Sequence, residues 1–136
     1  MLIRRNPIQC VDIIAELDDL LVLIERLNDP FGVGLSGGKI ESGETILEAA
    51  VRELKEETNL TFVYKGTLGI YDAPGRDPRG DYVSTVVYGK AYGIPRPEAN
   101  KTRVILQPPS EALRFGEAFV CDHRQMISDY LERVRG

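Results

Sequence analysis

The feature that most constrains this sequence is a glycine-rich segment that leads directly into a periodic apolar pattern. Residues 28–43 contain five glycines and one proline, a density that interrupts regular structure and lets the backbone approach a ligand closely. From Thr45 to about Asn59, apolar residues recur with the period of an amphipathic helix. This apolar stripe consists of Ile46, Leu47, Ala50, Val51 and Leu54. The sequence therefore predicts a loop over residues 28–43, followed by a helix that buries the stripe.

Runs of branched apolar residues on both sides of this unit predict β-strands. Residues 11–17 and 20–26 are separated only by two aspartates and predict a hairpin, and three further runs predict single strands. These runs are Phe62–Tyr71, Tyr82–Tyr92 and Arg103–Leu106. Asp122 and Gln125 resemble a capping box at the start of a final helix. Strands interleaved with helices indicate the α/β class, with a mixed sheet.

Composition and charge exclude several classes of protein. Apolar residues make up 43% of the 136 residues and charged residues 28%, which is typical of one globular domain rather than a disordered chain. The net charge is −4 and no run of Lys or Arg exceeds two, so we expect no nucleic-acid partner. The longest apolar stretch, Leu20–Ile24, is far shorter than the roughly 20 residues that cross a bilayer, so we expect no membrane partner. Two cysteines without CxxC spacing, and no leader sequence at the start of the chain, predict a cytoplasmic protein.

Three glutamates of the predicted helix fall close together around its axis. At 100° per residue, Glu53, Glu56 and Glu57 share an arc of roughly 100° that overlaps the edge of the apolar face. Like charges three or four residues apart destabilise an exposed helix by roughly 0.2 to 0.5 kcal/mol per pair, and by more when they are partly buried. A bound cation would remove that cost, and oxygen ligands without His or Cys favour Mg²⁺ or Mn²⁺ over Zn²⁺. A solvated glutamate-rich surface is the alternative interpretation.

The glycine-rich segment and the helix together resemble the Nudix box, a pattern of nine fixed positions that here spans 23 residues. Eight of the nine positions match. They are Gly38, Glu44, Arg52, Glu53, Leu54, Glu56, Glu57 and Leu60. Asn59 stands where the family has glycine; asparagine is the next-best residue in the left-handed conformation, so a helix C-cap is still expected there. Ser36 stands where the family's lead-in has proline, which predicts a looser loop.

This resemblance implies the Nudix-type α/β/α sandwich with a mixed β-sheet, formed as a single domain over residues 1–136. It implies hydrolysis of a diphosphate linked to another moiety, with Mg²⁺ as the cofactor and Mn²⁺ as a substitute. By the same resemblance Glu53, Glu56 and Glu57 bind the metal, and Glu53 or Glu57 also polarises water.

Further residues take roles from the resemblance as well. Arg52 would orient the carboxylates and Glu44 would support them, while Gly37 and Gly38 would bring backbone close to the metal. Glu98 is the one carboxylate in the loop after the long strand, where one subgroup of the family commonly has an acidic pair. It is therefore the candidate for a loop-borne base or an extra metal ligand, and otherwise Glu57 or Glu53 takes that role.

The charged loop over residues 71–84 is similar to that of small ADP-ribose pyrophosphatases within the Nudix family. By this resemblance Arg76 and Arg79 would grip phosphate or ribose hydroxyls, although a self-satisfied Arg–Asp pair is the alternative. Tyr71 or Tyr82 would stack on a base, or would fill the core at a strand end. His123, the only histidine, is expected to be structural at a helix N-terminus.

The expected activity is hydrolysis of a small nucleotide, ADP-ribose, to AMP and ribose 5-phosphate. Two alternatives stay open at this point. One is a nucleoside triphosphate pyrophosphohydrolase of the same fold, and the other is a sensor that binds ADP-ribose without cleaving it. The resemblance also allows a homodimer, in which a partner chain would complete the substrate pocket.

Overall fold

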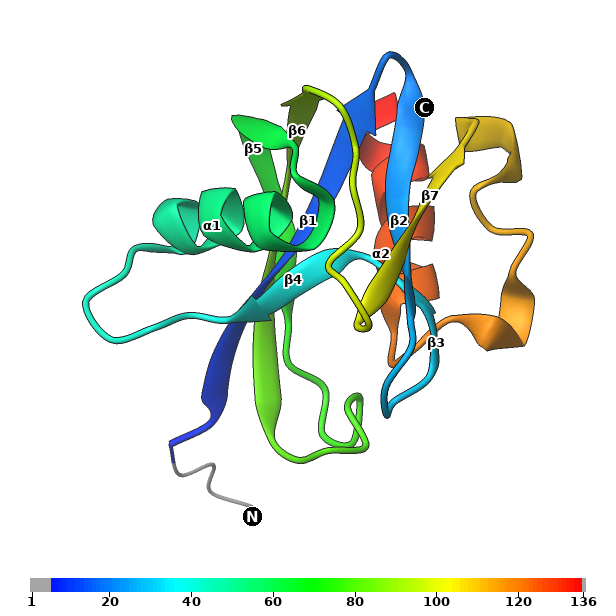
Figure 1. The fold of residues 1–136 in the computed structure, drawn as a ribbon. Helices are drawn as coiled ribbons and strands as arrows, with labels where there is room; N and C mark the ends of the chain where they lie inside the picture. The colour runs from blue at the N-terminus through cyan, green and yellow to red at the C-terminus, as the bar shows by residue number, and fades with distance from the viewer. Residues whose placement is uncertain (1–5, 136) are drawn as a thin grey trace.

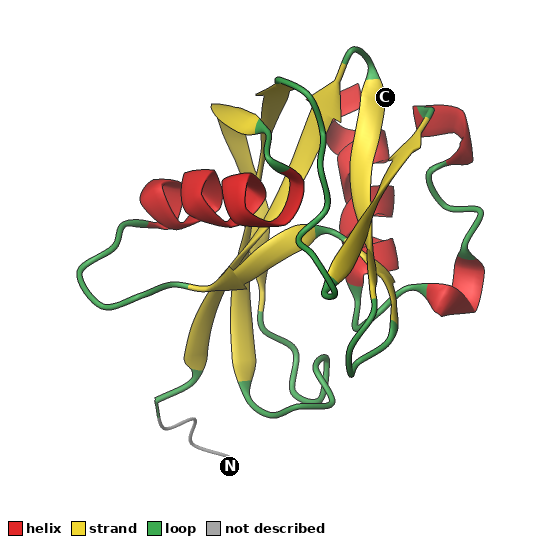
Figure 2. Ribbon diagram, in the orientation of Figure 1, coloured by secondary structure: helices red, strands yellow, loops and turns green. Residues whose placement is uncertain are grey.

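Seven strands in residues 6–135, the part of the chain that the computed structural model describes, form one mixed sheet. The strands are β1 (Ile8–Leu17), β2 (Leu20–Arg26), β3 (Gly32–Gly34), β4 (Ser36–Lys39), β5 (Thr61–Tyr71), β6 (Tyr82–Tyr92) and β7 (Thr102–Gln107). The helices α1 (Ile46–Thr58) and α2 (His123–Tyr130) pack against the sheet (Figure 1). Figure 2 shows the two short 3₁₀ turns, Pro109–Glu111 and Gly116–Ala118, that precede α2. A π-helical turn, Leu131–Arg135, follows it.

Alternation along β1 places one helix on each face of the sheet. Val11 and Ile13 are fully buried in a cluster that contains Leu54 of α1, whereas Ile14 is fully buried in a cluster that contains Ile127 of α2. Successive side chains of a strand point to opposite faces, so the two clusters form separate layers of core. Burial of each such side chain stabilises the fold by roughly 1.5 to 3 kcal/mol. The arrangement confirms the predicted α/β/α sandwich.

The central strands confirm the predicted hairpin and the mixed sheet. β1 pairs antiparallel with β2 through the Asp18–Asp19 turn, whose residues have positive φ angles of 48° and 67°. β1 also pairs with β6, in parallel from Ile8 opposite Tyr82 to Glu16 opposite Lys90. The main order across the sheet is β3-β2-β1-β6-β5, with β4 paired to β1 and β7 paired to β2.

The prediction of a continuous loop over residues 28–43 is wrong, because this segment contains β3 and β4. β4 pairs antiparallel with β1, with Gly37 opposite Asp12 and Gly38 opposite Val11. A side chain at Gly37 would collide with the backbone of Val11 and the side chain of Asp12. The glycines therefore let two strands come unusually close, rather than breaking regular structure.

Helix α1 forms where it was predicted, and it buries Ala50 and Leu54 of the predicted stripe but not its other three residues. Ile46, Leu47 and Val51 are 40%, 44% and 40% exposed, whereas Ala49, Ala50 and Leu54 are fully buried. The small alanines allow the helix to lie close to the sheet, which turns the neighbouring large side chains outward. Thr45 and Glu48 form a capping box at the start of α1. Asn59 ends it in the left-handed conformation at φ 66°, which confirms the predicted cap.

The predicted capping box at Asp122 does not form, although α2 begins at His123 as expected. The Asp122 side chain makes no capping hydrogen bond and instead pairs with Arg76, while Gln125 donates to Asp129. A local motif is replaced here by a contact with a residue 46 positions away in the chain. Within residues 6–135, no helix has the length and apolar character needed to span a bilayer.

Candidate active site

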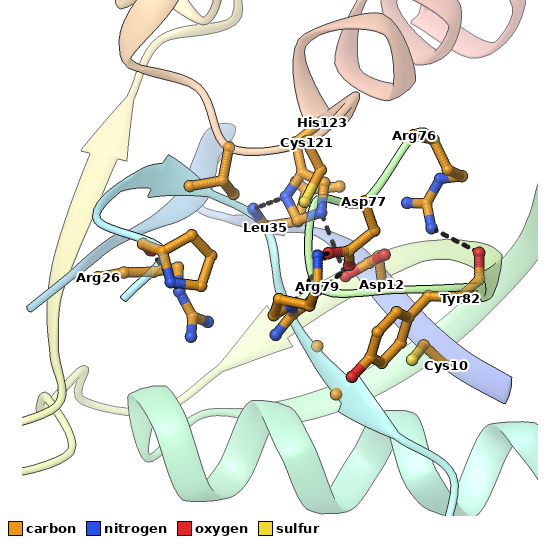
Figure 3. A pocket seen from close by; sticks show the side chains of 14 residues that line it. Cys10, Asp12, Arg26, Leu35, Arg76, Asp77, Arg79, Tyr82, Cys121 and His123 are labelled. Carbon is orange, nitrogen blue, oxygen red and sulfur yellow. Dashed lines mark hydrogen bonds and ion pairs between the residues drawn. The ribbon is translucent and has the colours of Figure 1, made fainter. Parts of the chain in front are cut away.

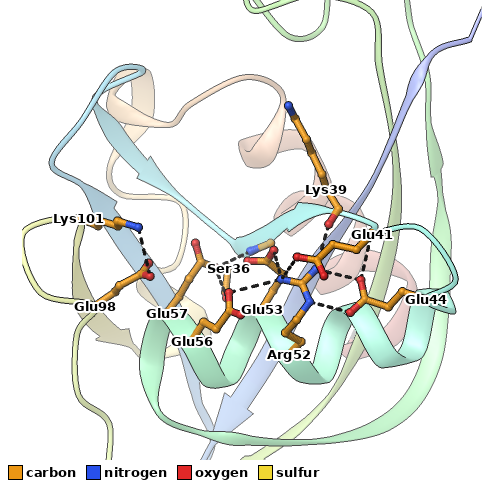
Figure 4. Close-up of polar contacts among 11 residues, drawn as sticks. Ser36, Lys39, Glu41, Glu44, Arg52, Glu53, Glu56, Glu57, Glu98 and Lys101 are labelled. Carbon is orange, nitrogen blue, oxygen red and sulfur yellow. Dashed lines mark hydrogen bonds and ion pairs between the residues drawn. The ribbon is translucent and has the colours of Figure 1, made fainter.

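The carboxylate of Glu57 lies where α1 meets β4 (Figure 4). Glu57 is 7% exposed, and its Oε1 accepts hydrogen bonds from the Ser36 hydroxyl at 2.6 Å and from the Gly37 N–H at 2.8 Å. Leu54, one turn earlier on the same side of α1, is fully buried. Glu57 is therefore an interior acid, and the alternative of a solvated glutamate-rich surface does not hold for it.

The pKa of Glu57 is raised from its ordinary value of 4.5 to about 8, chiefly because burial disfavours the charged form. The hydrogen bonds from Ser36 and Gly37 oppose this rise, and the nearby carboxylates of Glu53 and Glu98 add to it. A carboxyl group with this pKa exchanges its proton near neutral pH. A cation placed beside it would favour the ionised form.

Arg52 links the other two glutamates of the acidic cluster Glu53, Glu56 and Glu57. Its Nη1 donates to Glu53 Oε1 at 2.8 Å and to Glu56 Oε2 at 3.4 Å. Burial raises the pKa of Glu53 in spite of this guanidinium, whereas the side chain of Glu56 is 51% exposed. A side chain at Gly38 would collide with the Glu53 carboxylate, so the glycine allows backbone to lie directly against it.

The same guanidinium connects α1 to the segment before it. Arg52 Nε and Nη2 donate to the two carboxylate oxygens of Glu44 at 2.6 and 2.9 Å, and Nη2 also donates to the carbonyl of Lys39. The hydrogen bonds from Arg52 and from the Glu41 N–H lower the pKa of Glu44 to about 2. Glu44 therefore stays ionised, and it fixes the position of Arg52 against the acidic cluster.

Glu98 reaches the acidic cluster from the loop between β6 and β7. Its charge contributes to the raised pKa values of both Glu53 and Glu57, and Figure 4 shows it beside the end of α1. Its carboxylate lies 3.6 Å from the Lys101 ammonium, and the side chain is 31% exposed. The structure thus brings together Glu53, Glu56, Glu57 and Glu98 from two separate segments.

A polar cavity lies on the other side of the glycine strand β4 (Figure 3). Gly37 and Gly38 line it together with residues from β1, β2, β6, the charged loop over residues 72–81, and the start of α2. The charged and titratable members are Cys10, Asp12, Arg26, Arg76, Asp77, Arg79, Tyr82, Cys121 and His123. The Gly37 N–H donates to Glu57, so a single residue connects the cavity to the acidic cluster.

Arg79 is held at this cavity by two neighbours. Its Nε and Nη2 donate to the two carboxylate oxygens of Asp77 at 3.0 and 2.7 Å, and its guanidinium lies 4.9 Å from the centre of the Tyr82 ring. Asp77 is 5% exposed, whereas the Arg79 side chain is 42% exposed. The predicted pairing of arginine and aspartate within the loop is therefore present, and it orients a guanidinium that is still accessible.

Arg76 and Tyr71 make different contacts from Arg79. Arg76 Nε and Nη2 donate to Asp122 at 2.9 and 2.8 Å, and Nη1 donates to the Tyr82 carbonyl, which ties the charged loop to the start of α2. The Tyr71 hydroxyl donates to Asp129 of α2 at 2.5 Å, and Tyr71 packs against the core layer on that face. Tyr82, not Tyr71, is the tyrosine that lines the cavity.

Comparison with known proteins assigns this arrangement to a family. The sequence profile of the NUDIX domain matches residues 5–128. The chain belongs to the Nudix family. A curated relative, an ADP-ribose pyrophosphatase of Methanocaldococcus jannaschii, is 49% identical over 96% of this chain and 77% of its own length. A putative 8-oxo-dGTP diphosphatase of Bacillus subtilis is 32% identical, over 52% of this chain and 48% of its own length.

Solved structures of Nudix proteins share the fold. The NUDIX domain of Shewanella oneidensis NrtR, in complex with ADP ribose, superposes with a TM-score of 0.83 and is 25% identical over 96% of this chain and 90% of that chain. A bifunctional NMN adenylyltransferase/ADP ribose pyrophosphatase of Francisella tularensis, in complex with AMP and a Mn ion, has a TM-score of 0.82 and 25% identity. The match covers 95% of this chain but only 42% of the Francisella chain.

The acidic cluster of this Nudix chain has donor atoms of the kind that a divalent metal prefers, but its side chains are not arranged around an ion. Its donors are all carboxylate oxygens, and burial together with the neighbouring carboxylates raises the pKa values of Glu53 and Glu57. Within the described residues, no three His, Cys, Asp or Glu side chains are already arranged to hold an ion. Arg52 donates to Glu53 Oε1 and to Glu56 Oε2, which leaves the second carboxylate oxygen of each residue without a hydrogen bond from this guanidinium.

The two departures from the Nudix pattern have clear structural roles. Ser36, expected to loosen a loop, is fully buried in β4, and its hydroxyl donates to Glu57. That expectation is wrong because a serine can supply a hydrogen bond to a buried carboxylate, which proline cannot. Asn59 caps the helix, and its amide also donates to the Ile94 carbonyl at 3.0 Å.

Sequence reasoning missed Asp12 and Ser84 and treated His123 as a structural residue. The Ser84 hydroxyl donates to Asp12, and His123 Nδ1 accepts from the Leu35 N–H at 3.0 Å, so His123 does hold structure together. Both Asp12 and His123 also line the cavity. The available signal was the position of Asp12, a charged residue among the apolar residues 10–15 of β1.

Proposed function

We propose that this chain hydrolyses the pyrophosphate bond of ADP-ribose to AMP and ribose 5-phosphate, with Mg²⁺ as cofactor and Mn²⁺ as a substitute. The observation that carries the proposal is a buried acid, Glu57, bonded to the same glycine that lines a polar cavity. The substrate is supported by the Methanocaldococcus relative, which is named an ADP-ribose pyrophosphatase and matches almost the whole chain. The Shewanella NUDIX domain, which binds ADP ribose, adds to that support.

The acidic cluster takes the metal in this proposal, with Glu53, Glu56 and Glu57 as ligands. A divalent ion supplies positive charge for the phosphate oxygens and activates water for hydrolysis. Arg52 and Glu44 keep the cluster in position through their bidentate pair. The absence of a side chain at Gly37 exposes backbone on the cavity side of β4, and its absence at Gly38 exposes backbone to the Glu53 carboxylate.

The general base is one of Glu53, Glu57 and Glu98. Glu57 is favoured for this role because a divalent ion bound beside this buried carboxyl group would keep it ionised and able to accept a proton from water. Glu98 is the alternative because it is more exposed and lies on a loop beside the cluster.

Arg79 is proposed as the residue that binds the pyrophosphate, because its guanidinium is both oriented and accessible. Arg76 is proposed to act indirectly, since Asp122 and the Tyr82 carbonyl already occupy its donors. A base-stacking role for Tyr71 stays a prediction.

Replacement of Arg79 by lysine is expected to raise KM for ADP-ribose about tenfold while kcat changes little. Lysine cannot make the bidentate pair with Asp77 and stack on Tyr82 at the same time, so the cation loses its fixed position. Steady-state kinetics measure the effect, with Arg103→Lys on exposed β7 as the matched control. A fall in kcat at constant KM would contradict this role for Arg79.

A cytoplasmic location, action as a single domain and a homodimer are further parts of the proposal. Cys10 and Cys121 are free thiols, as expected in a reducing compartment. The exposed side chains of Ile46, Leu47 and Val51 give α1 an apolar outer face that suits contact with a second chain. Sedimentation of the purified protein tests the oligomeric state.

Product analysis across a nucleotide panel tests the function. With millimolar Mg²⁺ we expect AMP and ribose 5-phosphate from ADP-ribose, and with excess EDTA we expect neither product. Release of inorganic pyrophosphate from nucleoside triphosphates instead would favour the triphosphate pyrophosphohydrolase. Binding of ADP-ribose without cleavage would favour the sensor.

A further inference from the structure

Asp12 presents a carboxylate oxygen to the cavity beside the acidic cluster. Its neighbours Val11 and Ile13 face α1, so the Asp12 side chain points to the α2 face of the sheet, where it is 7% exposed. One oxygen, Oδ2, accepts a hydrogen bond from the Ser84 hydroxyl. The other, Oδ1, lies against Gly37, where any side chain would collide with it.

His123 presents a donor toward the same point (Figure 3). Its Nδ1 accepts the backbone N–H of Leu35, so in the neutral ring the proton is carried by Nε2. Nε2 lies 3.7 Å from Asp12 Oδ1. This separation is too long for a direct hydrogen bond, and within residues 6–135 neither atom has another hydrogen-bond partner.

A donor and an acceptor 3.7 Å apart can both bond to one oxygen placed between them, at about 2.8 Å from each. A hydroxyl group suits this position because it accepts from Nε2–H and donates to Oδ1 with the same atom. A phosphate oxygen does not suit it, because it cannot donate and would be repelled by Asp12. Of the arginines that line the cavity in residues 6–135, Arg76 pairs with Asp122, Arg79 pairs with Asp77 and Arg26 donates to the Pro30 carbonyl, so no guanidinium there donates a hydrogen bond to Asp12.

We propose that Asp12 and His123 form a hydroxyl-recognition pair that binds one ribose of the substrate and so determines its specificity. The inference rests on the proposed function, in which a pyrophosphate at the acidic cluster carries a ribose on each side. Gly37 separates the pair from Glu57 by a single residue, so a hydroxyl bound here belongs to a sugar attached to that pyrophosphate. The sugar is either the adenosine ribose or the terminal ribose.

Variants of Asp12 and His123 can distinguish a role in recognition of the substrate from a role in stabilising the fold. Asp12→Asn keeps the size of the side chain and an acceptor for Ser84, but removes the charge. His123→Asn keeps an acceptor near Nδ1 for the Leu35 N–H and removes the Nε2 donor, whereas His123→Gln restores a donor near Nε2. Asp18→Asn, in the exposed hairpin turn, is the matched control.

The first measurement is calorimetric binding of AMP and of ribose 5-phosphate to each variant. We expect Asp12→Asn and His123→Asn to lower the binding affinity for one of the two products by about ten- to a hundredfold and to leave the affinity for the other unchanged. The product whose affinity falls identifies which ribose the pair binds. Partial recovery in His123→Gln is expected, together with unchanged affinity in Asp18→Asn.

The second measurement is kcat and KM for ADP-ribose and for analogues that lack single hydroxyls of either ribose. For one analogue, wild type and Asp12→Asn should have the same KM, because the interaction is already absent. The proposal would be overturned if Asp12→Asn raised KM equally for every analogue, or if it lowered the affinity for both products equally. Either result would indicate a purely structural role for the pair. If wild type does not cleave ADP-ribose, the proposed function fails, and the same binding series with the true nucleotide still tests the pair.

Discussion

Replacement of Glu57 by glutamine is expected to lower kcat for ADP-ribose hydrolysis by at least two to three powers of ten. Glutamine keeps the shape of the side chain and an oxygen that can accept from Ser36 and Gly37. It removes the charge that holds a divalent ion and the group that accepts a proton. Removal of one such electrostatic contribution typically lowers kcat by about this factor. Steady-state kinetics with saturating Mg²⁺ measure the effect.

The controls for this experiment come from the same chain. Glu25→Gln removes a carboxylate whose partner, Arg103, is exposed on the surface, and it should leave kcat unchanged. Calorimetric titration with Mn²⁺ should show weaker binding to Glu57→Gln than to wild type. Retention of full activity in Glu57→Gln would show that the interior acid has no part in the chemistry.

The second prediction is that the metal-free protein loses stability as the pH rises from 4.5 to 8. The unfolded chain releases the Glu57 proton near pH 4.5, whereas the folded protein holds it to about pH 8 because burial raises the pKa. The unfolded state therefore binds fewer protons in this window, so the free energy of unfolding falls with pH. Each pH unit lowers the free energy of unfolding by at most about 1.4 kcal/mol, so the loss of stability amounts to a few kcal/mol by pH 8. Urea unfolding in EDTA at several pH values measures this loss.

Glu53 also contributes to this fall, because burial raises its pKa above 4.5 as well, whereas Glu16 does not. For Glu16, burial is outweighed by hydrogen bonds from Arg135 and Tyr130, which lower its pKa below 4.5. Its stabilising effect is present above pH 4.5 and is lost only as the pH falls further. The stability of Glu57→Gln should therefore fall less steeply than that of wild type between pH 4.5 and 8, with the remaining slope due to Glu53. Saturating Mg²⁺ should reduce the slope in wild type, since the ion competes with the proton. An equal slope in wild type and Glu57→Gln would refute the prediction.

Local patterns in the sequence were sufficient for most of the strands and for the ends of α1. Two adjacent aspartates between apolar runs predicted the hairpin, and Asn59 predicted a left-handed cap, because these features depend on the backbone preferences of a few neighbouring residues. The acidic cluster was also readable, since helical geometry alone brings Glu53, Glu56 and Glu57 to one side.

Features that depend on a distant partner were predicted less well. Apolar periodicity indicated that Ile46, Leu47 and Val51 are buried, but Ala49 faces the sheet instead, because the depth of a helix against a sheet depends on both surfaces. Ser36 was interpreted as a loosened loop because its partner, Glu57, is 21 residues away. Asp122 pairs with Arg76 rather than capping its own helix for the same reason.

The sequence by itself therefore determined the family, the type of fold and the acidic cluster on α1, because each is encoded in residues close together in the chain. The tertiary structure alone decided which acid is interior, which arginine is accessible and that Asp12 faces His123. These properties follow from burial and from distances between segments far apart in sequence. No local pattern contains that information, because the same side chain is ionised and solvated in one environment, and protonated and enclosed in another.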